Sequence, residues 1–340
     1  MNFTAKRVIS LALVTTGIFL LLCTGFFAFA LLNGYLYTTG HFAESVFSDV
    51  FLPLLYILGV VSFAVFGFLF RSSLSGRQMK GTLPVFFASG FAALGFGVWL
   101  FSFALDFFKN KHAVPSTLFG ILLLVFGVVA ILYFVFNANP TAPSHTTAVL
   151  LGMGVVLFFL SYAFYAYFDT TFALNSPVKL LDQVTAIAAM LFFLVELRFS
   201  FGATSEAVYV PLCMTTVLLS GAGSIGALIY NAVDGRPLIV HVAHDFLLLA
   251  TALYATARLA SFLLKPLFEK TGESADAPAF EADDSIARPT RTDPTQETFD
   301  FDKESSDEPA EETHSAPEAN EETISLPEDE AAIDFDSSRE

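Results

Sequence analysis

Apolar residues in this chain form long continuous blocks, and a short polar cluster separates each block from the next. A helix needs about 20 residues to cross the ~30 Å hydrocarbon layer of a membrane, and the blocks have that length. Strands of a membrane barrel would instead alternate apolar and polar residues over about 10 positions. The pattern therefore predicts transmembrane helices at residues 8–32, 50–70, 83–105, 116–136, 147–168, 178–197, 207–230 and 238–264.

Composition agrees with a chain that lies in lipid. Apolar types make up 54% of the 340 residues and charged types only 15%, whereas a typical soluble protein has about 25% charged residues. The polar segments between the predicted helices are short, so no soluble catalytic domain fits between them. We expect an all-α fold, a polytopic membrane helix bundle of about eight transmembrane helices.

The first block resembles a signal peptide, because Lys6 and Arg7 precede it and the small-residue stretch 28–30 lies near its end. The apolar region of a signal peptide is about 7 to 15 residues long, and the run at 8–32 is longer. We therefore interpret this block as an uncleaved first transmembrane helix.

Charge changes abruptly near Thr271. Residues 1–270 carry 13 basic and 10 acidic side chains, a net charge of +3. Residues 271–340 carry 4 basic and 23 acidic side chains, a net charge of −19, and the two segments together give the total of −16. With few large apolar residues, this segment cannot bury enough surface to offset the entropy lost on ordering. We expect a transmembrane domain over 1–270 and a disordered acidic tail over 271–340.

Orientation can be predicted from Lys and Arg, which concentrate on the cytosolic side of membrane helices. With the N-terminus inside, the inner flanks hold eight of these residues and the outer flanks four, if Arg258 inside the last helix is set aside. The inner ones are Lys6, Arg7, Arg71, Arg77, Lys80, Arg198, Lys265 and Lys270, and the outer ones are Lys109, Lys111, Lys179 and Arg236. We predict cytoplasmic N- and C-termini, in a cell membrane that the short loops suggest is bacterial.

Several apparent motifs carry no chemistry in this setting. Gly221, Gly223 and Gly226 spell G-x-G-x-x-G, but a nucleotide site needs a strand before these glycines, and here they lie in an apolar helix. Small residues there, like Gly90, Gly95 and Gly97 in the third block, favour close helix packing instead. The chain has no G-x-S-x-G, H-E-x-x-H or Walker sequence, so we expect no enzyme, no cofactor and no nucleic-acid partner.

Ionisable residues inside membrane helices are the strongest candidates for a site. Asp182 lies in the sixth block, and His241, His244 and Asp245 share one face of the eighth because their spacings are three and four. Asp182 and His241 both lie about 5 to 8 Å below the outer flank, so they share a layer. Imidazoles and carboxylates at one level could bind a transition metal, pass protons, or only join helices by hydrogen bonds. The sequence leaves open whether the sixth and eighth helices touch.

Glu196 lies 14 residues after Asp182 in the sixth block. At 100° per residue the two carboxylates differ by about 40° in direction, with about 21 Å of helix between them. Both therefore belong to one polar stripe, which should face other helices rather than lipid. We expect Glu196 to meet the membrane surface or another helix, and we assign it no catalytic role.

Two classes of function remain open. The first is a non-enzymatic scaffold or signalling protein whose tail recruits a basic cytosolic protein; the second is a transporter of an ion or small solute that uses the polar residues of the sixth and eighth helices. The tail favours the first class, because Phe299, Phe301 and Phe335 lie in short acidic-aromatic islands. Such islands can dock in an apolar groove while the carboxylates steer the tail to a basic partner.

The orientation predicts which loops face outward. Single cysteines in the outer loops, in a chain without Cys23 and Cys213, should react with an impermeant thiol reagent in intact cells. The positions to test are 40, 109, 170 and 234. Protection of positions 40 and 234 together would reverse the orientation.

Recruitment by the tail can be tested with the isolated 271–340 peptide. Replacing Phe299, Phe301 and Phe335 by Ala should release a captured basic protein, and capture by the unchanged peptide should weaken as salt rises, because its charges are screened over about 8 to 10 Å. If the triple variant captures the same proteins as the unchanged peptide, the aromatic islands are not recognition motifs.

Overall fold

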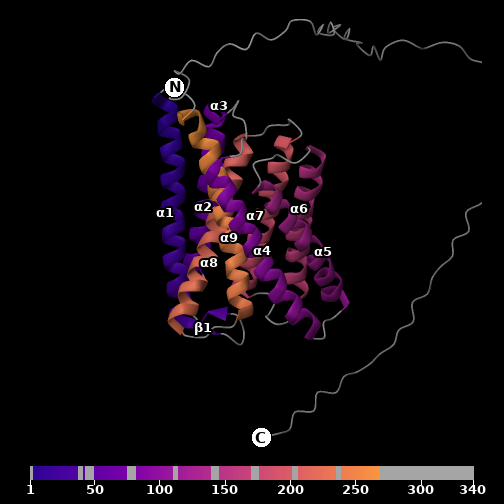
Figure 1. Ribbon diagram of the computed structural model, residues 1–340. Helices are drawn as coiled ribbons and strands as arrows, with labels where there is room; N and C mark the ends of the chain where they lie inside the picture. The colour runs from indigo at the N-terminus through magenta and orange to yellow at the C-terminus, as the bar shows by residue number, and fades with distance from the viewer. Residues whose placement is uncertain are drawn as a thin grey trace, which may run out of the picture. The chain divides into compact units, whose positions relative to one another are not determined.

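The computed structural model describes residues 3–36, 41–42, 50–74, 82–109, 114–138, 145–169, 176–200, 206–234 and 239–268. The described elements follow the chain in the order of Figure 1. They are α1 (Phe3–Gly34), β1 (Tyr35–Leu36), β2 (His41–Phe42), α2 (Leu52–Leu69), α3 (Arg71–Leu74), α4 (Leu83–Lys109), α5 (Val114–Asn137), α6 (His145–Phe168), α7 (Pro177–Ser200), α8 (Glu206–Asp234) and α9 (Ile239–Phe268).

Eight of these helices are long and apolar enough to cross a membrane, as the sequence predicts. They are α1, α2 and α4 to α9, and each coincides with one apolar block. The multi-pass helical architecture is therefore confirmed. The predicted tail, with Phe299, Phe301 and Phe335, lies outside the described residues.

One detail departs from an all-α fold. In the segment after α1, β1 and β2 pair antiparallel, with Tyr35 opposite Phe42 and Leu36 opposite His41. The Phe42 side chain is buried and its ring contacts Phe27 of α1. The hairpin thus packs against the bundle, which hydropathy alone does not reveal because two-residue strands carry no periodic pattern.

Six helices form a closed ring. Going round it, α4 packs on α5, α5 on α6, α6 on α7, α7 on α8, α8 on α9, and α9 again on α4. Helices α1 and α2 lie outside this ring and pack mainly on α8 (Figure 1). Helix α8 therefore has neighbours on most sides, which explains why it is the most buried of the eight.

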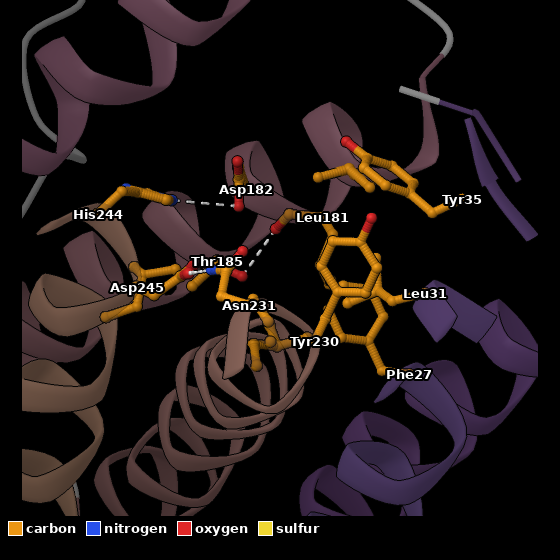
Figure 2. A pocket seen from close by; sticks show the side chains of 15 residues that line it. Phe27, Leu31, Tyr35, Leu181, Asp182, Thr185, Tyr230, Asn231, His244 and Asp245 are labelled. Carbon is orange, nitrogen blue, oxygen red and sulfur yellow. Dashed lines mark hydrogen bonds and ion pairs between the residues drawn. The ribbon is translucent and has the colours of Figure 1, made fainter. Parts of the chain in front are cut away.

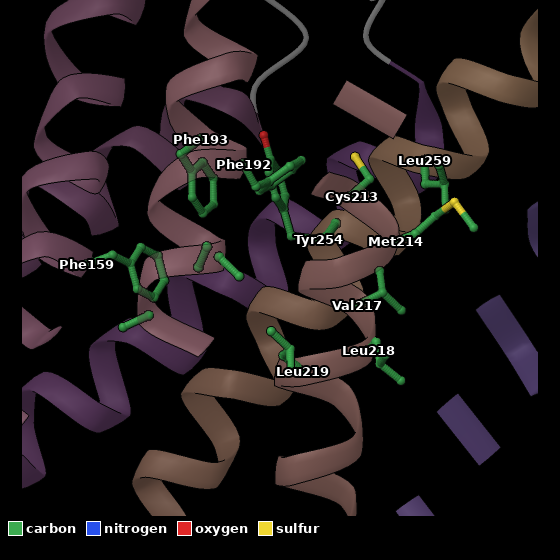
Figure 3. Close-up of a cluster of buried hydrophobic side chains, with 14 of the residues drawn as sticks. Phe159, Phe192, Phe193, Cys213, Met214, Val217, Leu218, Leu219, Tyr254 and Leu259 are labelled. Atoms are coloured by element: carbon green, nitrogen blue, oxygen red, sulfur yellow. The ribbon is translucent and has the colours of Figure 1, made fainter. Parts of the chain in front are cut away.

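Aromatic side chains fill the centre of the ring. Phe96 of α4 contacts Phe134, Phe158 and Phe159, with ring centroids 5.0 to 5.9 Å apart. Phe193 of α7 stacks on Phe159, and the cluster continues to Tyr254 of α9 (Figure 3). Aromatic pairs add about 0.5 to 1.5 kcal/mol each beyond burial. The described helices are thus held together at the centre by packed rings.

Some glycines lie where two helices approach each other closely, as the sequence predicts, and others do not. A Cβ on Gly95 would lie 2.6 Å from the Ala250 Cβ of α9, and one on Gly221 would lie 2.9 Å from the Leu20 side chain of α1. A Cβ on Gly97 would have no heavy atom within 4 Å. The packing interpretation is therefore right for Gly95 and Gly221 and wrong for Gly90 and Gly97, which both face open space.

These two glycines of α4 give a matched test. Gly95→Leu should destabilise the folded protein by about 1 to 3 kcal/mol, because the new side chain would force α4 away from α9. Gly97→Leu adds the same side chain two residues away and should destabilise the folded protein much less. Thermal unfolding in detergent measures both, and equal losses for the two variants would contradict the close α4–α9 contact.

Candidate functional site

A cavity of about 120 Å³ lies where α7 and α9 begin and α1 and α8 end. One side of it is polar and holds Asp182, Asn231, His244 and Asp245. Aromatic and aliphatic side chains, including Phe27, Leu31, Tyr35 and Tyr230, form the other side (Figure 2). Since a water needs about 10 to 15 Å³ of such volume, the cavity has room for several waters or a small solute.

Asp182 and His244 meet across this cavity. The Nε2 atom of His244 lies 3.5 Å from Oδ1 of Asp182, and the two side chains are 20% and 28% exposed. Their helices, α7 and α9, each pack on α8 and have no comparable contact with one another. The side chains therefore bridge two helices whose backbones stay apart.

Tyr162 of α6 holds the imidazole from another side. Its ring stacks on His244 with centroids 5.5 Å apart and an angle of 14° between the ring planes. Its hydroxyl lies 3.3 Å from both ring nitrogens of His244. His244 is thus fixed between α6 and α7, which gives its ring a defined orientation at the cavity.

Asp245 is the most buried carboxylate of the cavity, with 7% of the residue exposed. The Asn231 side chain of α8 donates a hydrogen bond of 3.1 Å to its Oδ2 atom. A carboxylate buried in this way needs donors or a positive charge nearby. Asn231 supplies one such donor, and a protonated His244 would supply charge one residue away in the chain.

The four sequence-predicted residues have different outcomes. Asp182 and His244 contact each other. Asp245 lines the same cavity, but its hydrogen-bond partner is Asn231. His241 lies in α9, one turn before Asp245, but its side chain is outside the part of the structure that is described. Among the described residues, no group of three or more His, Cys, Asp or Glu side chains is arranged to hold a metal ion.

A second acid–base pair joins the same two helices further along. The Nε of Arg258 lies 2.7 Å from Oε1 of Glu196. Tyr254 donates a hydrogen bond of 2.8 Å to the same oxygen and accepts one of 2.9 Å from Arg258. Glu196 is 5% exposed, so this pair is buried within the bundle. As expected, Glu196 meets another helix.

The other carboxylate oxygen of Glu196 has no hydrogen-bond partner among the described residues. This oxygen, Oε2, is buried. The Tyr133 hydroxyl lies nearby in the network, 3.4 Å from the hydroxyl of Tyr254. A buried oxygen of this kind can accept a proton, a water or another donor.

The two pairs repeat at the same interval on both helices. Asp182 and Glu196 are 14 residues apart on α7, and His244 and Arg258 are 14 residues apart on α9. Fourteen residues give nearly four turns, or about 21 Å of helix. The acids therefore lie along one face of α7 and the bases along the facing side of α9, at two levels.

Sequence reasoning missed Arg258, Tyr254, Tyr162 and Asn231 as members of the polar layers. Arg258 was set aside because it lies within an apolar helix, although its 14-residue distance from His244 repeats the distance from Asp182 to Glu196. That repeat was the available signal. Nothing in the sequence distinguishes Tyr162 or Asn231 from other polar residues near helix ends.

Comparisons with protein-family models, with curated proteins and with solved structures find no match to this chain. A functional assignment has to be argued from the cavity and the two acid–base pairs themselves.

Proposed function

We propose that the helix bundle is a membrane transporter that carries protons by way of the Asp182–His244 pair on the wall of the adjoining cavity. The observation that carries the proposal is the contact of an imidazole with a carboxylate, 3.5 Å apart, on the wall of a 120 Å³ cavity. Ionisable residues in membrane helices are costly and usually serve ion or proton pathways.

The surroundings of His244 support a proton rather than a metal ion. The titratable groups that face it are Asp182 from α7, Tyr162 from α6 and Asp245 beside it on α9. The carboxylates supply oxygens that can accept a hydrogen bond from an imidazole N–H, so a proton can be shared within this group. A structural zinc site would need four ligands, and the described side chains offer no group of even three.

The Glu196–Arg258 pair offers the transported proton a second binding place in the bundle. Glu196 has one oxygen bound to Arg258 and Tyr254, and its other oxygen is free of described partners. The packed rings of Phe193 and Tyr254 lie against this pair. Transfer between the two levels would therefore need α7 and α9 to shift, as in alternating-access transporters.

Proton transport can be measured in liposomes that contain the purified protein and a trapped pH-sensitive dye. A membrane potential should drive proton entry that Asp182→Asn or His244→Gln reduces to the level of protein-free liposomes. The double variant should lose no more than either single one, because both remove the same pair.

Matched controls are Asp106→Asn and His41→Gln, which change the same residue types outside the cavity lining. Both should retain proton entry, and thermal unfolding would establish that all variants are folded. Full proton entry in folded Asp182→Asn and His244→Gln proteins would refute the proposed site.

A second role is proposed on the sequence alone. The acidic segment 271–340 would recruit a basic cytosolic protein through Phe299, Phe301 and Phe335, which makes the chain a scaffold as well. Eight membrane crossings would bring the N-terminus and this tail to the same side, and the distribution of Lys and Arg favours the cytosolic side of a bacterial cell membrane. The net charge of −19 on the tail would keep it away from anionic lipid.

A further inference from the structure

A second and larger cavity lies outside the ring, between α2 and α7. Its volume is about 840 Å³, and α8 forms its floor. Helices α2 and α7 each pack on α8 without a comparable contact between them. The gap between them is therefore a lengthwise groove, which differs from the cavity at Asp182 in both position and lining.

Apolar side chains line most of this groove. Several of them are well exposed, including Phe68 at 80%, Val208 at 47% and Ile187 at 45%. Between Val60 and Arg71 the lining follows α2 and the start of α3 for 11 residues, or about 16 Å of helix. This length is close to half of the ~30 Å hydrocarbon layer, the depth of one lipid leaflet.

Charged groups lie at one end of the groove only. Arg71, at the start of α3, and Glu206, at the start of α8, both line it, and α3 packs on α8. Near these charges α2 crosses α8 closely, because a Cβ on Gly67 would overlap the Pro211 side chain. Because proline has no N–H, Pro211 leaves the Ala207 carbonyl without its usual helical donor, and this carbonyl packs against Gly67 of α2.

We propose that this groove binds one phospholipid whose headgroup carries both a phosphate and a primary ammonium, as in phosphatidylethanolamine. An acyl chain would lie along the apolar lining over the depth of one leaflet. The phosphate would bind the guanidinium of Arg71, and the ammonium would donate hydrogen bonds to the carboxylate of Glu206. This site is independent of the proton site proposed above.

The pair of opposite charges selects this headgroup among common lipids. An anionic lipid without an amine would bring negative charge to Glu206, which is only 9% exposed, and would be repelled. The quaternary ammonium of phosphatidylcholine has no N–H to donate. A primary ammonium has three donors, and a carboxylate can accept several hydrogen bonds at once.

The test uses the full-length protein in detergent, with phosphatidylethanolamine, phosphatidylcholine or phosphatidylglycerol of the same acyl chains added in turn. Native mass spectrometry gives the bound fraction, and thermal unfolding gives the stabilisation. Phosphatidylethanolamine should bind most tightly. Arg71→Gln and Glu206→Gln should each weaken its binding about tenfold or more, the loss expected for one charge-assisted hydrogen bond.

Two further variants separate the groove from general lipid contact. Ala64→Trp fills the groove from an exposed position on α2, and Val65→Trp places the same ring beside it, outside the lining. Only Ala64→Trp should abolish the preference for phosphatidylethanolamine, and Arg198→Gln, an exposed charge outside the groove, should leave it intact. Equal binding of the three lipids, or equal effects of the two Trp variants, would overturn the proposal.

Discussion

A charged side chain at the centre of a membrane costs about 2.5 to 3.5 kcal/mol or more unless it is paired or reaches water. Arg258 of α9 lies within a candidate membrane span, and only 12% of its side chain is exposed. Its contact with Glu196 of α7 and its hydrogen bond to Tyr254 neutralise and satisfy it inside the protein. The backbones of α7 and α9 both pack on α8 and have few close approaches to one another, so this pair and the ring contact of Phe193 with Tyr254 connect the two helices through their side chains.

Helix α8 allows the pairing because its inner part is made of small residues. Ser220, Gly221, Ala222, Gly223 and Ser224 are all buried, so neighbouring helices approach its backbone closely. Ser224 bonds to carbonyls of its own helix, which satisfies its hydroxyl without a partner elsewhere. The side chains of α7 and α9 can then reach across at two levels, where Asp182 meets His244 and Glu196 meets Arg258.

The two levels differ in what they can do. The Asp182–His244 pair lies on a cavity wall and is partly exposed, so its proton can exchange with bound water or solute. The Glu196–Arg258 pair is more buried and is surrounded by Phe193, Tyr254 and Tyr133. On the proposed proton pathway, the first pair would bind and release a proton, and the second would hold the bundle in one state until a proton reaches the Oε2 atom of Glu196.

Hydropathy was sufficient to predict the helices, since a run of apolar residues long enough to span lipid has few other stable forms. It could place Asp182, His244 and Asp245 at one depth, because helical rise converts sequence position into height. It could not predict contacts between helices: whether Asp182 reaches His244, or Gly95 rather than Gly97 touches α9, depends on rotation and packing. The hairpin of β1 and β2 was missed because its strands are too short to show a pattern.

The central claim is that α7 and α9 are bridged by acid–base pairs, and the contact between Arg258 and Glu196 in a lipid bilayer tests it most directly. Solid-state NMR on protein with ¹⁵N-labelled Arg and ¹³C-labelled Glu detects the dipolar coupling between the guanidinium Nε and the carboxyl carbon. The contact of 2.7 Å between Nε and Oε1 predicts a strong coupling that disappears in Glu196→Gln. A spectrum without that coupling, or one that Glu196→Gln leaves unchanged, would contradict the account.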